Sequence, residues 1–357
     1  MKKVIEIKTE FRIWTFMINP QRIDLISGDY KFFAEYPFLN NNTGYLTDVN
    51  PSMFHLMLYV LLYGLEKVHL PKPELMNPGN ILVSYSGGVD STATLWYTKG
   101  VPVHITRSYD AVYESRQIRA CNYVNAFQIT TDFERVRQIY ITRHGFNVGI
   151  GYISMYLPIL NLIGCSTVAL GTILEGIAFH SGDEFFFNES YTNSNSFKII
   201  KELKKFGINI ILPLAGHSEV LTIDMAAKSG IKHYSSCHTI GNEDSCRNCF
   251  KCFRKEAICG NPLEWDKIKN KIIPFLKKKP LTAASSTVYA IQRANYKNTI
   301  FDRYKDIDVS FCERVNMSLT ELFSNDMNVL YPFQTAEDIN HIKDFAQFIN
   351  DPEIYNF

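Results

Sequence analysis

The sequence predicts an α/β fold in which a parallel, twisted sheet carries helices on both faces. From residue 79 onward, short runs of apolar β-forming residues alternate with segments of helical spacing. This alternation is typical of βαβ units, whose strands lie parallel and whose helices cover both faces of the sheet. The composition agrees, because 46% of the 357 residues are apolar and the net charge is +1, which allows a large packed core.

Residues 1–76 are predicted to form an N-terminal α+β extension. Apolar and polar residues partly alternate over residues 1–18, as in a pair of strands. A helix is predicted from about residue 50 to residue 68, because an Asn-Pro-Ser start precedes an apolar segment. Its most apolar part, residues 53–65, is shorter than a membrane span, so we expect a buried helix and no membrane partner.

Residues 77–236 are predicted to form the main domain, with the ligand at the carboxyl ends of its strands. After a first strand that begins near residue 79, β-forming runs predict strands at residues 101–106, 127–130, 167–171 and 208–212. Helical spacing predicts helices at residues 111–121, 149–163, 197–206 and 218–228. Residues 261–357 are predicted to form a mostly helical C-terminal region.

The loop after the first strand of this domain indicates phosphate binding. Glycines let the backbone approach an anion closely, and the N–H groups at a helix start favour negative charge. Asp90 would suit a magnesium ion held by the phosphates, and an ordinary capped turn without a ligand is the alternative. The candidate ligands of a bound nucleotide are Ser84, Ser86, Gly87, Gly88, Val89, Asp90, Ser91 and Thr92.

Residues 237–260 are predicted to be a zinc segment with four cysteine ligands. Cys237 is followed, after a short loop, by two consecutive Cys-x-x-Cys steps at Cys246, Cys249 and Cys252. Such steps let two thiolates share one ion, and four thiolates make a closed tetrahedral site of structural type. An iron–sulfur cluster and unliganded or redox-active cysteines are the alternatives. Cysteines grouped in this way indicate a reducing compartment, so we expect a cytoplasmic protein.

Charge excludes other classes of function. The 37 Lys and Arg residues balance 36 Asp and Glu residues, so a broad basic surface for nucleic acid is not expected. Glu6, Lys8 and Glu10 interrupt any apolar run near residue 1, so no secretory signal is expected.

The loop and the cysteines together resemble one branch of the PP-loop ATP pyrophosphatases. Residues 86–91, the Leu-Pro-Leu step at residues 212–214, and the cysteines followed by Arg254 resemble the 7-cyano-7-deazaguanine synthases over residues 79–260. No Gly-Lys-Ser follows the loop, so it is not a Walker A loop. The resemblance implies an adenine nucleotide α-hydrolase-like fold, with ATP and Mg²⁺ at the loop and structural Zn²⁺ at the cysteines.

The family's reaction is implied with it. In that family, ATP adenylates the carboxylate of 7-carboxy-7-deazaguanine, AMP and pyrophosphate are released, and ammonia forms an amide that a second ATP converts to the nitrile. By position, Asp90 and Ser91 would act at the reacting phosphates, and Arg143 would contact ATP or the substrate. We expect Glu175 to lie near the substrate as a third catalytic residue; its alternative is a carboxylate satisfied by a helix start. His217 and Asp183 are further candidates.

The regions outside the resemblance leave other partners open. Related proteins of bacterial antiphage islands carry similar additions, and this resemblance suggests a ligase that joins a deazaguanine acid to a protein amine. A tRNA-thiolation enzyme is a second alternative, which would need a sulfur relay at Cys246 and Cys249. A non-catalytic binding subunit of a defence complex is a third. The two terminal regions could bind a partner protein, close over the base or form a homodimer.

Overall fold

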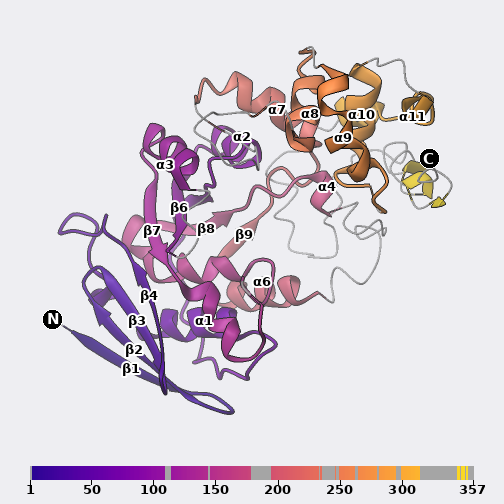
Figure 1. Ribbon diagram of the computed structural model, residues 1–357. Helices are drawn as coiled ribbons and strands as arrows, with labels where there is room; N and C mark the ends of the chain where they lie inside the picture. The colour runs from indigo at the N-terminus through magenta and orange to yellow at the C-terminus, as the bar shows by residue number, and fades with distance from the viewer. Residues whose placement is uncertain are drawn as a thin grey trace.

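The sheet and the C-terminal helices occupy opposite sides of the molecule, and α2 and α7 lie between them (Figure 1). The computed structural model describes residues 2–108, 114–143, 145–177, 194–232, 234, 246, 249–261, 264–279, 281–294, 299–313, 344–345, 347–349 and 351–352.

The sheet is mixed, so the predicted parallel sheet is wrong. Its nine strands lie in the order β1-β2-β3-β4-β7-β6-β5-β8-β9. The first four pair antiparallel, namely β1 (Lys3–Lys8), β2 (Ile13–Asn19), β3 (Arg22–Ser27) and β4 (Tyr30–Glu35). The other five pair parallel with one another, namely β5 (Asn80–Ser84), β6 (Val101–Arg107), β7 (Phe127–Thr131), β8 (Cys165–Ala169) and β9 (Asn209–Ile211). Strands β1 to β4, which were predicted to belong to a separate N-terminal extension, therefore continue the sheet formed by the parallel strands of the main domain.

The antiparallel and parallel parts meet where β4 pairs with β7. Ala34 and Thr131 are antiparallel partners. The Phe33 N–H donates to the Asp132 carboxylate at 2.7 Å, and the Thr131 hydroxyl donates to the Phe33 carbonyl at 2.8 Å. Without β4, β7 would be an edge strand with unpaired backbone groups. The junction thus closes one side of the parallel part, and the strand pair predicted for residues 1–18 is confirmed as β1 and β2.

Helices cover both faces of the parallel strands. Neighbouring residues of a strand point to opposite faces, and Leu82 and Val83 of β5 accordingly belong to different hydrophobic clusters. The cluster of Leu82 includes side chains of α1 (Pro51–Leu62) and α6 (Asn195–Lys205), and that of Val83 includes side chains of α2 (Val89–Thr98) and α3 (Glu114–Tyr123). The β5–α2 loop is therefore fixed by packing on both sides of the strand that precedes it.

One predicted helix does not form. Residues 149–163 contain three short 3₁₀ segments, Gly151–Met155, Leu157–Ile159 and Asn161–Ile163, in place of one α-helix. Pro158 prevents a continuous α-helix here, because proline has no N–H for the i→i−4 hydrogen bond and its ring clashes with the preceding turn. The first two segments still bury apolar side chains in the cluster of Leu82, and Leu162 and Ile163 of the third pack against it partly buried, so the apolar pattern predicted burial rather than helical structure.

A third hydrophobic cluster joins the C-terminal helices to the first turn of α2. It contains side chains of α7 (Glu219–Lys228), α8 (Phe250–Ile258), α9 (Trp265–Leu276) and α10 (Ala284–Ala294), and Phe301 of α11 (Thr299–Asp302). Val89 at the start of α2 and Leu174 of α4 (Leu174–Ile177) belong to the same cluster. Helix α2 is thus packed directly against the C-terminal helices at its first turn.

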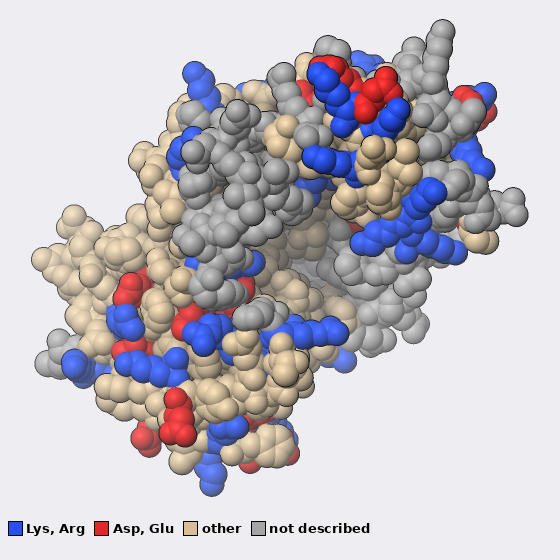
Figure 2. All heavy atoms as spheres, in the orientation of Figure 1, with Lys and Arg blue, Asp and Glu red and all other residues tan. Residues whose placement is uncertain are grey.

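Among the described residues, no helix is long and apolar enough to cross a membrane. On the face drawn in Figure 2, basic and acidic side chains are interspersed, in agreement with the balanced charge of the sequence. The domain boundaries after residues 76, 236 and 260 stay predictions.

Replacing Asp132 should weaken the sheet junction. In Asp132→Ala, the partly buried Phe33 N–H loses its carboxylate acceptor, and a hydrogen bond to a charged group contributes about 1.5–3 kcal/mol. Urea unfolding should show that loss, whereas Asp29→Ala, on an exposed turn of the same sheet, should change the free energy of unfolding by less than about 0.5 kcal/mol. Equal effects of the two variants would contradict the proposed importance of the junction.

Candidate nucleotide and metal site

The loop between β5 and α2 depends on glycines for its shape. Gly87 has φ of +73°, which favours glycine, and a Cβ there would lie 2.9 Å from the Ala120 Cβ on α3. Gly88 is the N-cap of α2. At the end of β8, a Cβ on Gly171 would lie 3.1 Å from the Ser91 nitrogen. The carboxyl ends of β5 and β8 therefore both approach the first turn of α2.

Ser91 closes the loop from within. Its hydroxyl accepts from the Ser86 N–H at 3.2 Å and donates to the Gly88 carbonyl at 3.1 Å. The Ser86 and Ser91 hydroxyl oxygens lie 3.1 Å apart, and because the Ser91 proton is donated to Gly88, Ser86 is the donor of this pair. Because Ser91 is buried and Ser86 is exposed, only Ser86 presents its hydroxyl to solvent at the tip of the loop.

Three of the predicted loop ligands point into the protein. The Ser84 hydroxyl lies 2.8 Å from the Tyr156 hydroxyl, and Thr92 is fully buried. Val89 packs in the cluster of the C-terminal helices. These three side chains support the loop from inside the protein. Residues 86–88 and Asp90 remain as the candidate nucleotide ligands at the start of α2.

Asp90 is held by α7. The Thr222 hydroxyl donates to Asp90 Oδ1 at 3.0 Å, and Asp90 is partly buried. Burial raises the pKa of Asp90 to about 6, and the nearby charge of Glu219 acts in the same direction. Lys255, the Thr222 hydroxyl and Lys251 oppose this rise in pKa. Asp90 is therefore ionised at pH values above about 6 and can bind a cation there.

A buried ion pair joins α7 to α8. Arg254 donates from Nε and Nη2 to the two carboxylate oxygens of Glu219, at 2.8 and 3.1 Å. The Ser286 hydroxyl of α10 also donates to Glu219, at 3.0 Å. Burial acts to raise the pKa of Glu219, but Arg254, Lys255 and the Ser286 hydroxyl together outweigh it, so that the pKa lies below its ordinary value. Glu219 is thus a fixed anion between three helices.

Glu175 lies at the start of α7. Both of its carboxylate oxygens accept from the Glu219 N–H, at 3.1 Å, and one accepts from the Ser285 hydroxyl at 2.9 Å. Burial raises the pKa of Glu175 to about 7, and the charge of Glu219 adds to the effect. Its contacts match the structural alternative considered for the sequence, a carboxylate at a helix start, although the helix is α7 rather than its own.

Lys251 and Lys255 are candidate site residues that were not predicted from the sequence. They lie four residues apart on α8, hence on one face, and both are partly buried. Burial lowers the pKa of Lys255, and Glu219 and Asp90 oppose that effect. Two lysines at helical spacing, one inside the second Cys-x-x-Cys step and one three residues after it, are a signal in the sequence that could have identified them.

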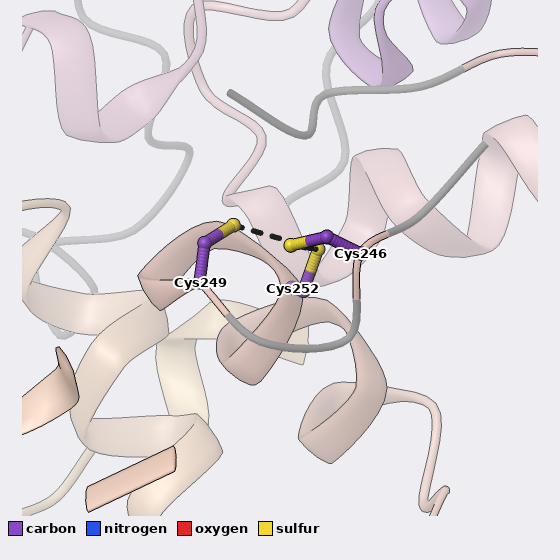
Figure 3. A group of neighbouring side chains, drawn as sticks. All are labelled: Cys246, Cys249 and Cys252. Atoms are coloured by element: carbon purple, nitrogen blue, oxygen red, sulfur yellow. Dashed lines mark hydrogen bonds between the residues drawn. The ribbon is translucent and has the colours of Figure 1, made fainter. Parts of the chain in front are cut away.

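Three cysteines converge at the beginning of α8 (Figure 3). Cys252 Sγ lies 3.5 Å from Cys249 Sγ and 3.7 Å from Cys246 Sγ, and the three sulfurs could hold a metal ion. Thiolates bound tetrahedrally to zinc at about 2.3 Å lie roughly 3.8 Å apart, so these distances suit one shared ion. Cys249 is the N-cap of α8 and Cys252 lies in its first turn, so a bound ion would fix this end of the helix.

Among the other predicted residues, His217 lies beside α4 and α7, because its carbonyl accepts from the Leu174 N–H at 2.9 Å and it directly precedes the N-cap of α7. Arg143 is exposed and forms no ion pair within the described residues. His217 is buried, and burial lowers its pKa to about 4, so its imidazole is neutral at pH 7. Cys237, the predicted fourth metal ligand, and Asp183 lie outside the described residues.

Comparison with known proteins gives a partial match. A family described as "Family of unknown function (DUF6395)" matches residues 198–336, which is less than half of the chain. This span includes Glu219, Thr222, the cysteine cluster and both lysines, whereas the β5–α2 loop precedes it. No curated protein matches the chain.

Replacing Glu175 by glutamine should change the pH dependence of stability. A carboxyl with a raised folded-state pKa binds protons more tightly in the folded state, so its contribution is lost as pH rises from about 4.5 to about 7. Relative to Glu175→Gln, the wild type should lose about 3 kcal/mol over this range. Urea unfolding at pH 4.5 and pH 8 measures this loss of unfolding free energy. Glu6→Gln is the control, because Glu6 is exposed. An unchanged difference between wild type and Glu175→Gln would rule out this ionisation.

Metal content should depend on the clustered cysteines. The purified protein should contain about one metal ion per chain by elemental analysis, and Cys249→Ser should lose most of it, because one thiolate ligand is removed. Cys259→Ser is the matched control, since Cys259 is exposed and lies outside the cluster. Loss of metal from both variants, or from neither, would show that these three sulfurs are not the site.

Proposed function

We propose that the chain is an ATP-dependent carbon–nitrogen ligase that adenylates a carboxylate and releases AMP and pyrophosphate. The observation that carries the proposal is the arrangement at α2, where a Gly-Gly loop, Asp90 and the lysines of α8 share one region. Helix-start N–H groups and ammonium groups favour phosphate oxygens. A carboxylate beside them suits the magnesium ion that accompanies a nucleoside triphosphate.

The proposed reaction has two steps. A carboxylate oxygen of the substrate attacks the α-phosphorus of ATP, and the bond to the bridging oxygen breaks so that pyrophosphate leaves with the electron pair. A nitrogen nucleophile then attacks the carbonyl carbon of the acyl adenylate, AMP leaves, and the nitrogen releases its proton to solvent. Such chemistry requires positioning and charge neutralisation more than an acid–base pair, which agrees with the residues around the loop.

Each part of the cluster has a proposed role. The N–H groups at the start of α2 bind the phosphates, and Asp90 is the magnesium ligand, which would neutralise phosphate charge. Because Glu175 bonds to the start of α7, we assign it to fixing α7 rather than to contact with the substrate. We propose zinc as the ion at the cysteines, since a closed thiolate site is structural and holds α8 in place.

We propose a 7-deazaguanine-like acid as the substrate. This choice rests on the resemblance of the loop and the Cys-x-x-Cys-x-x-Cys pattern to the deazaguanine synthases, and the nitrogen donor is ammonia or a protein amine. The clustered cysteines favour a cytoplasmic site of action, where thiolates stay reduced and metal-bound.

The test is product analysis with 7-carboxy-7-deazaguanine, ATP, Mg²⁺ and ammonium. AMP and pyrophosphate should appear in equal amounts, whereas ADP would reject the scheme. Asp90→Asn keeps the Thr222 hydrogen bond but removes the charge, and should lower the rate of AMP formation by about 100-fold or more. Asp29→Asn, on an exposed turn, should leave the rate unchanged. A fully active Asp90→Asn would remove Asp90 from the mechanism.

A further inference from the structure

Helix α8 carries more positive charge than its surroundings neutralise. Lys251, Arg254 and Lys255 lie at i, i+3 and i+4, so they share one side of the helix. Glu219 neutralises Arg254 through the bidentate pair. Neither lysine forms an ion pair or a hydrogen bond within the part of the chain that the structure describes, although both are partly buried. Cations removed from water without a partner are costly, which favours a bound anion.

Arg254 provides a second, independent sign of a ligand. Its side chain is 5% exposed, and its Nε and Nη2 are occupied by Glu219. Its Nη1 is buried and has no hydrogen-bond partner within the described residues. Buried donors are nearly always satisfied in folded proteins, so an unmatched guanidinium nitrogen beside two unpaired lysines indicates an acceptor that binds there.

The helix α7 brings these cations to the phosphate loop. Glu219 and Thr222 lie one turn apart on α7, and Glu219 holds Arg254 while Thr222 holds Asp90. The charges of Lys251 and Lys255 reach Asp90 in the first turn of α2. Two sources of positive potential, the start of α2 and one side of α8, therefore act on one region.

We propose that Lys251 and Lys255, with Nη1 of Arg254, bind the pyrophosphate end of the nucleotide, opposite the N-terminus of α2. The inference rests on the proposed function and extends it to residues of the cysteine-bearing helix. Pyrophosphate suits the site by charge, because both lysines act on Asp90, which itself needs a cation, and on Glu219, which Arg254 already neutralises. A multiply charged anion with a divalent cation satisfies all of these groups together.

The experiment is calorimetric titration with Mg²⁺–pyrophosphate, which requires no reaction. Lys251→Met and Lys255→Met should each weaken binding roughly 10-fold to 100-fold, since each removes a charged hydrogen-bond donor. Lys255→Arg should bind with most of the wild-type affinity, because arginine keeps the positive charge that Lys255→Met removes. Lys271→Met is the matched control, an exposed and unpaired lysine on α9, and it should bind as the wild type does.

The outcomes separate this inference from the proposed function. Unchanged affinity in both folded Lys→Met variants, as judged by thermal melting, would overturn the inference even if AMP is formed. Lysine-dependent pyrophosphate binding without AMP formation would support the anion site and reject the ligase reaction. An equal loss of affinity in Lys271→Met would show a general charge effect and would also overturn the inference.

Discussion

The buried ion pair between Glu219 and Arg254 is the contact on which the arrangement of the site depends. Because its two hydrogen bonds join α7 to α8, it fixes the helix that holds Asp90 against the helix that carries the cysteines. Breaking such a pair by removing one partner leaves a buried charge, at a cost of about 3–5 kcal/mol. The Glu219 N–H also binds Glu175, so one residue connects α4, α7 and α8.

The order of elements could largely be predicted from the sequence, but the sheet could not. Strands and helices from residue 79 onward follow local periodicity, which a sequence shows directly. The antiparallel junction depends on Phe33 meeting Asp132, and no local pattern specifies a contact of that separation. The helix predicted at residues 149–163 was wrong for another reason. The apolar residues of this segment indicate burial, but Pro158 prevents a continuous α-helix.

The candidate site shows the same division between local and distant information. Gly87, Gly88 and the cysteine spacing are local features, and the structure places the glycines in a turn at a helix start and three of the four predicted cysteine ligands in one sulfur cluster. The environment of Glu175 is different, because its partners Glu219 and Ser285 come from other helices. From the sequence alone, Lys251 and Lys255 would be taken for surface charges. Their position near Asp90 and Glu219 becomes apparent only in the structure.

The junction of β4 with β7 has a consequence for how the chain folds. Strands β1 to β4 are joined by short turns and can form early, since their contacts are local. The Phe33–Asp132 bond spans 99 positions, so it must wait for the intervening strands and helices. During synthesis, the N-terminal strands emerge first, and the β4 edge remains unpaired until β7 leaves the ribosome. That interval exposes a strand edge to pairing with other chains, so we expect translation speed over β5 to β7 to influence soluble yield.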